Sequence, residues 1–128
     1  MNIKVPSQKE LIDYYGKEDR TTVVMEELAE FAKTVSKYKR YVLNEDKYKK
    51  DKRDDEKVIV DNMKEEIADV LICIRIMQDI VGINDSEIEE EVQRKNDDNR
   101  LYVLWTRYVQ EIRCSCERDI SHKIGKEE

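Results

Sequence analysis

The 128-residue sequence has only three glycines, one proline, one phenylalanine and one histidine. Because glycine and proline build turns and interrupt helices, their scarcity favours long helices over a β-rich fold. The longest apolar run is far shorter than the roughly 20 residues that span a bilayer. The first ten residues also lack the apolar stretch of a signal peptide. We therefore expect an all-α protein of the cytoplasm that has no membrane partner.

Few side chains suit a soft or redox-active metal. The three cysteines, Cys73, Cys114 and Cys116, form no even disulfide framework, so reduced thiols are expected. Cys114, Cys116 and His122 have a spacing that is not typical of zinc sites. A di-iron carboxylate bundle needs two Glu-x-x-His motifs, and the single histidine excludes it.

Charge is abundant and slightly negative overall. Charged residues make up 42% of the chain, and 24 basic against 30 acidic residues give a formal net charge of −6. This balance argues against a surface built wholly for nucleic acid. Residues 37–53 are locally basic with tyrosines between the charges, so a nucleic-acid-binding segment stays open as an alternative.

Apolar residues recur at helical spacing along most of the chain. They predict a four- to five-helix bundle in one domain, residues 1–116, in which a partner subunit can help bury apolar surface. Capping boxes at Ser7 with Glu10 and at Ser86 with Glu89 mark two of the helix starts. A mobile charged loop at about 44–57 and a polar tail at 117–128 lie outside the helices. The predicted helices are 7–15, 20–43, 58–81, 86–100 and a fifth or continuing helix from 101.

Two of these helices carry regular apolar stripes at steps of three and four residues, which predict their core faces. The third helix is apolar on its other sides as well, so it needs neighbours on several sides. The stripe residues are Val24, Leu28, Phe31, Val35, Tyr38 and Val42 in the second helix, and Met63, Ile67, Val70, Ile74, Met77 and Val81 in the third.

Two acidic pairs border the stripes, Glu27 and Glu30 in "EELAE" and Glu66 and Asp69 in "EIAD". Each acid directly precedes a stripe residue, so each pair lies about 100° round the helix from the stripe. If the two helices pack through their stripes, the four carboxylates converge at the edge of the bundle.

Four converging carboxylates repel one another, and partial burial raises their pKa values unless a cation lies among them. Ligands that are all oxygen indicate Mg²⁺ or Mn²⁺ rather than Zn²⁺. Mg²⁺ in proteins keeps several waters and takes phosphate oxygens from a substrate, so a phosphate substrate is expected. A single acidic run is typical of a solvated helix face, but the second pair lies in the most apolar part of the chain.

With Glu26, Glu27 and Glu30 matching E-E-x-x-E and Glu66 and Asp69 matching E-x-x-D, residues 10–105 resemble the all-α NTP pyrophosphatase superfamily, specifically its MazG-like members. The resemblance implies a Mg²⁺-dependent, or Mn²⁺-dependent, pyrophosphohydrolase that converts an NTP or dNTP to the monophosphate and pyrophosphate. It also implies a homodimer or a tetramer of two dimers. Its implied metal ligands are Glu27, Glu30, Glu66 and Asp69, and Glu26 orients a metal-bound water.

The same resemblance assigns phosphate contacts to basic and polar residues in two segments, "SKYKR" and "RKNDDNR". A second hypothesis of another class is a catalytically inactive helical dimer that acts as an interaction or nucleic-acid-binding module. The residues assigned to phosphate are Lys37, Arg40, Lys95, Asn99 and Arg100.

Overall fold

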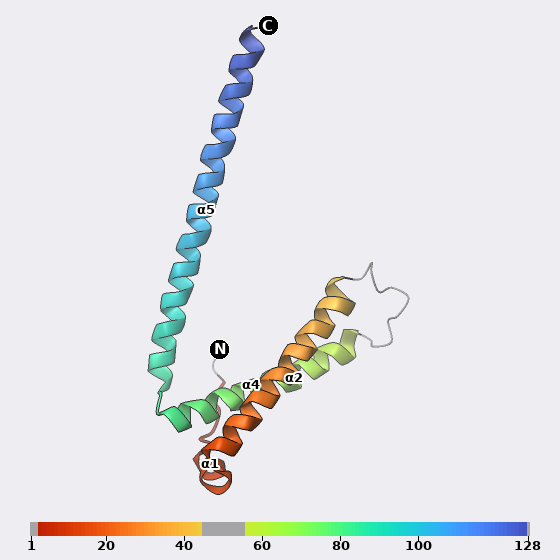
Figure 1. Cartoon of the computed structure of the whole chain (residues 1–128), viewed down its shortest axis with the longest axis vertical. Coiled ribbons are helices and arrows are strands. Elements are labelled where there is room, and N and C mark those ends of the chain that lie inside the picture. Colours follow the sequence, from red (N-terminus) through yellow and green to blue (C-terminus); the bar gives the residue numbers. More distant parts are fainter. Residues whose placement is uncertain (1–2, 45–55, 128) are drawn as a thin grey trace. The chain divides into compact units, whose positions relative to one another are not determined.

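The computed structural model describes residues 3–44 and 56–127, and all of their regular secondary structure is helical. These ranges contain no strand, which confirms the prediction of an all-α fold. None of the described helices has the length and apolarity that crossing a bilayer requires. The predicted mobile loop at 44–57 lies, for residues 45–55, outside the described residues. The helices are α1 (Lys9–Tyr15), α2 (Lys17–Tyr38), the π-helix η1 (Lys39–Leu43), α4 (Glu56–Val81) and α5 (Asp85–Glu127) (Figure 1).

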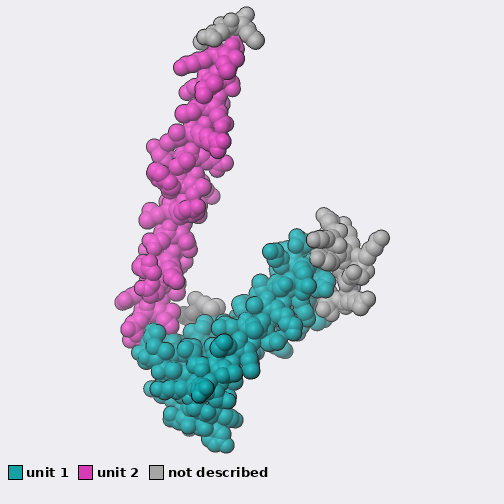
Figure 2. All heavy atoms as spheres, in the orientation of Figure 1, with its two compact units in different colours: residues 1–83 teal, residues 84–128 magenta. Residues whose placement is uncertain are grey.

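The chain divides into two compact units, residues 1–83 and residues 84–128 (Figure 2). In the first unit α2 packs along α4, and α1 contacts both of these helices. The second unit consists of α5. The grouping of residues 1–116 into one domain stays a prediction.

The start of α1 is held by a residue far away in the sequence. The predicted capping box at Ser7 is wrong, because the helix begins at Lys9 and has no side-chain cap from its N-cap residue, Gln8. Instead, Oδ2 of Asp79 in α4 accepts hydrogen bonds from the backbone N–H of Gln8 at 2.7 Å and from the Ser7 hydroxyl at 3.1 Å. The Asp79 carboxylate therefore satisfies one of the free backbone N–H groups at this helix start and holds the Ser7 hydroxyl, whose oxygen in turn accepts the backbone N–H of Lys9 at 3.4 Å.

The Asp79 side chain is only 6% exposed, and its Oδ1 lies 3.4 Å from Nε of Arg75. Burial by itself would raise the pKa of Asp79. The hydrogen bonds from Gln8 and Ser7, together with the charges of Arg75 and Lys9, outweigh burial and hold the pKa below its ordinary value. Asp79 is therefore a charged anchor between α4 and the segment before α1.

Replacing Asp79 with alanine is expected to lower the free energy of unfolding by about 1–2 kcal/mol, the usual cost of losing a helix cap. Urea denaturation followed by circular dichroism measures the change. Asp13→Ala is the matched control, because Asp13 is an exposed acid on α1 itself. Equal losses in the two variants would show that the contact with α4 does not hold the helix.

The first two helices meet at Gly16, near which the first predicted helix was expected to stop. Its φ of +91° lies in the left-handed region that glycine adopts without strain, and α2 begins at the next residue. The predicted second helix, 20–43, therefore begins three residues early, and its last turn is the π-helix η1. Gly82, with φ of +82°, follows the end of α4 at Val81 as expected.

The last helix begins with a reciprocal capping box formed by Asn84 and Glu87. Oδ1 of Asn84 accepts the backbone N–H of Glu87 at 3.0 Å, and Oε2 of Glu87 accepts the backbone N–H of Asn84 at 2.8 Å. The predicted box at Ser86 and Glu89 is therefore wrong by two residues. From Asp85 the helix runs without a break to Glu127, through the residues expected to form a polar tail.

The core of the first unit is small, and only part of the predicted stripes lies in it. Several predicted stripe residues on both helices are 42–61% exposed, so the predicted core face is wrong for them. The exposed stripe residues are Leu28, Val35, Ile67, Ile74 and Val81. The buried cluster consists of Ile12, Val24, Cys73 and Ile76, with Met77 and Ile80 packed against it.

Candidate metal centre

The faces that α2 and α4 bury pass through the acidic residues themselves. On α4, Ile59 and Cys73 are buried, and Glu66 lies seven residues from each. On α2, Thr34 is buried, and Glu27 lies seven residues before it. Seven residues are almost two helical turns, so residues at this spacing share a face. These acids therefore lie on the buried faces of the two helices, and the predicted position at the edge of the bundle is wrong.

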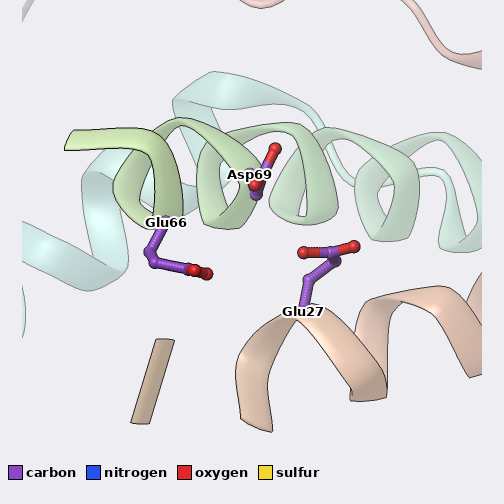
Figure 3. Close-up of side chains that lie close together, drawn as sticks. All are labelled: Glu27, Glu66 and Asp69. Atoms are coloured by element: carbon purple, nitrogen blue, oxygen red, sulfur yellow. The ribbon is translucent and has the colours of Figure 1, made fainter. Parts of the chain in front are cut away.

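Three of the four predicted ligands come together between the helices. One carboxylate oxygen each of Glu27, Glu66 and Asp69 lies within 4.8 Å of the other two, and all three residues are half-buried. Figure 3 shows Glu27 reaching from α2 towards Glu66 and Asp69, which project from α4. An ion at about 2.1–2.6 Å from each ligand holds oxygens that are up to about 4–5 Å apart. The three side chains could therefore hold one metal ion with only small adjustments.

The charges around Glu66 are unfavourable for an ionised carboxyl group. Burial raises the pKa of Glu66, and the negative charges of Asp69, Glu30, Glu27 and Glu65 raise it further. Its Oε2 is buried and has no hydrogen-bond partner among the described residues. A buried polar atom without a partner is costly. A bound cation would give this oxygen a partner and cancel the repulsion, so these residues fit a metal ion.

Cys73 lies four residues after Asp69 on α4 and is 3% exposed. Burial raises the pKa of this thiol, and the charges of Glu27 and Asp69 raise it further. The thiol therefore stays neutral at physiological pH. Cys73 belongs to the buried apolar cluster together with Val24.

Two other acids of the first motif lie outside the group of three. Glu30 is exposed, and its Oε2 lies 3.6 Å from Nζ of Lys33. Its charge still contributes to the raised pKa of Glu66. Glu26 is exposed as well. Metal binding by Glu30 and water orientation by Glu26 stay predictions.

The residues assigned to phosphate lie in both units. Lys37 is half-buried near the end of α2. Arg40 lies in η1, where its Nε donates to the backbone oxygen of Ser36 at 3.4 Å and its guanidinium carbon lies 5.6 Å from the ring centre of Tyr41. Their roles stay predictions. The remaining assigned residues, Lys95, Asn99 and Arg100, are exposed on α5.

The raised pKa of Glu66 predicts an unusual pH dependence for the metal-free protein. The folded chain binds this proton more tightly than the unfolded chain, so folding takes up a proton between the two pKa values. The free energy of unfolding is therefore expected to fall as the pH rises from about 4.5, the ordinary value for glutamate, through the raised pKa. Urea denaturation in chelator at several pH values measures this slope. Glu66→Gln should flatten it, and an identical slope in both proteins would contradict the assignment.

Residues 3–44 and 56–127 form an all-α fold with four α-helices and a half-buried Glu/Glu/Asp group that could hold a metal ion. No family model, no curated protein and no solved structure matches the chain. Membership of this chain in the MazG-like proteins therefore stays a prediction.

Proposed function

We propose that this protein is a Mg²⁺-dependent or Mn²⁺-dependent nucleoside triphosphate pyrophosphohydrolase, which converts an NTP or dNTP to the monophosphate and pyrophosphate. The observation that carries the proposal is the convergence of Glu27, Glu66 and Asp69, together with the buried oxygen of Glu66, which has no hydrogen-bond partner in the part of the chain that the structure describes. Ligands that are only oxygen favour a hard divalent ion. The order of the two acidic motifs and the spacing within each agree with those of the MazG-like proteins, whereas the 35 residues between Glu30 and Glu66 are more than those proteins usually have.

In this proposal the three half-buried carboxylates hold the ion, and Glu30 completes the set by turning away from Lys33. A bound Mg²⁺ would supply a water of lowered pKa and positive charge for the phosphate oxygens. The carboxylates occupy only part of an octahedral shell, so room remains for water and substrate. Glu26 orients the attacking water.

Positive side chains are also needed, because a triphosphate carries several negative charges. Lys37 and Arg40 lie about 15–20 Å along the helix from Glu27, at a rise of about 1.5 Å per residue. Their long side chains shorten this distance, so we assign them to the outer part of the phosphate chain. Lys95, Asn99 and Arg100 of α5 are assigned to phosphate by resemblance alone.

The exposed stripe residues of the first unit suggest how the fold is completed. Leu28 and Val35 on α2 and Ile67 and Ile74 on α4 are each 42–45% exposed. Exposed apolar side chains that recur at a spacing of seven residues on each of two adjacent helices are typical of a covered surface. We infer that a second copy covers them, which gives the homodimer, or the tetramer of two dimers, that the resemblance implies.

The proposed activity is tested by incubating the protein with a panel of NTPs and dNTPs in Mg²⁺ or Mn²⁺ and by measuring pyrophosphate. We expect pyrophosphate and the monophosphate in equal amounts from at least one nucleotide, and no product in excess chelator. Release of inorganic phosphate without pyrophosphate would indicate a contaminating phosphatase. No turnover of any nucleotide would contradict the proposal and favour the catalytically inactive interaction module.

A further inference from the structure

The carboxylate of Glu30 lies close to the three converging acids but is bound to a lysine. Glu30 follows Glu27 by three residues on α2, so the Cβ atoms of the two residues are about 5–6 Å apart. The negative charge of Glu30 also contributes to the raised pKa of Glu66 on the other helix. Yet Glu30 is not one of the three residues whose oxygens converge, and its Oε2 lies 3.6 Å from Nζ of Lys33. Lys33 therefore holds the fourth predicted ligand beside the site.

The pair of Lys33 and Glu30 is of a kind that a divalent ion can replace. Their side chains are 63% and 56% exposed. Exposed ion pairs contribute little, because water screens both charges and the long side chains lose freedom when they pair. A divalent ion among carboxylates is a much stronger local charge than one ammonium group. Glu30 can therefore exchange its lysine for the ion by rotating about its own side-chain bonds.

This exchange leaves the ammonium group of Lys33 without its partner. Lys33 lies six residues after Glu27, which is about 9 Å along α2. Lys37 and Arg40, which are assigned to the outer part of the phosphate chain, lie about 15–20 Å along the same helix. Lys33 is therefore the base that lies between the acids and these outer residues, where a phosphate group next to the ion would need a positive charge.

Two other bases lie near the acids in the sequence but are not placed for this role. Lys64 is two residues before Glu66, and this spacing turns it about 160° away around the helix. Arg20 is seven residues before Glu27, but its Nη2 lies 2.6 Å from Oδ2 of Asp19 and its side chain is only 16% exposed. Neither base is therefore available to a phosphate group at the ion.

We propose that Lys33 couples metal binding to phosphate binding. In the metal-free protein it holds Glu30 away from the other carboxylates, and in the loaded protein it binds the substrate phosphate closest to the ion. This inference rests on the proposed function, because it needs both the ion and a phosphate ligand. Since both ligands favour the same rearrangement of Lys33, each should raise the affinity of the protein for the other by the same factor.

Binding of Mn²⁺ to the full chain in the absence of nucleotide tests the first half of the proposal. Lys33→Gln should bind Mn²⁺ more tightly than the parent protein, by on the order of 5-fold, because no ion pair has to be broken. Electron paramagnetic resonance of the free ion measures the dissociation constant. Lys64→Gln is the matched control, since Lys64 forms a pair of the same spacing with Asp61. It should bind Mn²⁺ like the parent protein.

Removing a positive charge favours cation binding by itself, so the same substitution is also made in the Glu30→Gln protein. If Lys33 acts through Glu30, Lys33→Gln should lose most of its effect there, because the partner it competes for is gone. Circular dichroism checks that all variants stay helical. An equal gain in Mn²⁺ affinity with and without the Glu30 carboxylate, or no gain in either, would overturn the proposal.

Calorimetric titration with inorganic pyrophosphate at saturating Mg²⁺ tests the second half. Pyrophosphate is a product of the proposed reaction and requires no choice of base. Lys33→Gln should weaken its binding by on the order of 10-fold, because a charge-assisted contact is lost, and Lys64→Gln should not. The same affinity in Lys33→Gln and the parent protein, or no binding to either, would overturn this inference while the proposed function stands if Mn²⁺ binds. Failure of the parent protein to bind Mn²⁺ would overturn both.

Discussion

Replacing Asp69 with asparagine is expected to lower pyrophosphate release by at least about 100-fold at saturating nucleotide and Mg²⁺. Loss of an outer-shell partner of a metal ligand usually costs about 10–100-fold, so loss of a direct ligand should cost no less. The change removes a negative charge and keeps the shape of the side chain. The helix and the packing around Asp69 should therefore persist, and circular dichroism in chelator checks this.

Asp61→Asn provides the matched control for that experiment. It makes the same chemical change on the same helix, at an exposed residue whose Oδ1 lies 3.1 Å from Nζ of Lys64. Exposed ion pairs contribute about 0–1 kcal/mol, so this variant should keep full activity. Full activity in Asp69→Asn, or an equal loss of activity in Asp69→Asn and Asp61→Asn, would contradict the assignment of Asp69 as a metal ligand.

Glu66→Gln is expected to change stability in opposite directions with and without metal. In chelator at neutral pH the variant should be more stable than the parent protein. The reason is that a neutral amide replaces a carboxyl group whose pKa is raised by burial and by neighbouring acids. In Mg²⁺ the parent should gain stability, by about 2.7 kcal/mol when the free ion is at 100 times its dissociation constant. The variant should gain little or nothing, and thermal melting with and without Mg²⁺ measures both effects.

The opposite signs separate a metal site from an ordinary structural acid. Glu65→Gln serves as the control, because Glu65 is exposed on the same helix and lies outside the group of three. It should keep the gain in Mg²⁺. If Glu66→Gln instead destabilised the metal-free protein and kept the gain in Mg²⁺, Glu66 would have a packing role and the ion would bind elsewhere.

The spacing of apolar residues predicted most of the helices, and the two acidic motifs predicted that Glu27 meets Glu66 and Asp69, although the predicted packing through the apolar stripes was wrong. The spacing did not predict which face of α4 is buried. That helix is apolar on nearly all sides, so a stripe through Ile67 and Ile74 fits its sequence as well as the buried face at Cys73. Packing against α2 decides between them, and a single helix pattern holds no information about a neighbour.

Helix ends show the same limit. Local pairs such as Ser7 with Glu10 fit the capping pattern, but Asp79 is brought to the start of α1 by the fold and is the stronger acceptor. Its role has no signal in the sequence, since the two segments lie more than 60 positions apart. At α5 the local pattern correctly predicted a capping box. The structure places this box two residues earlier, at Asn84 and Glu87.

A titration with Mn²⁺, followed by electron paramagnetic resonance of the free ion, tests most directly whether the carboxylates of α2 and α4 bind a cation. We expect the signal of free Mn²⁺ to fall in proportion to the protein added, and Mg²⁺ to restore it by competition. Glu27→Gln and Asp69→Asn should each abolish most of the binding, whereas Asp61→Asn should bind like the parent protein. Absence of binding by the parent protein, or binding that both ligand variants retain, would contradict the account.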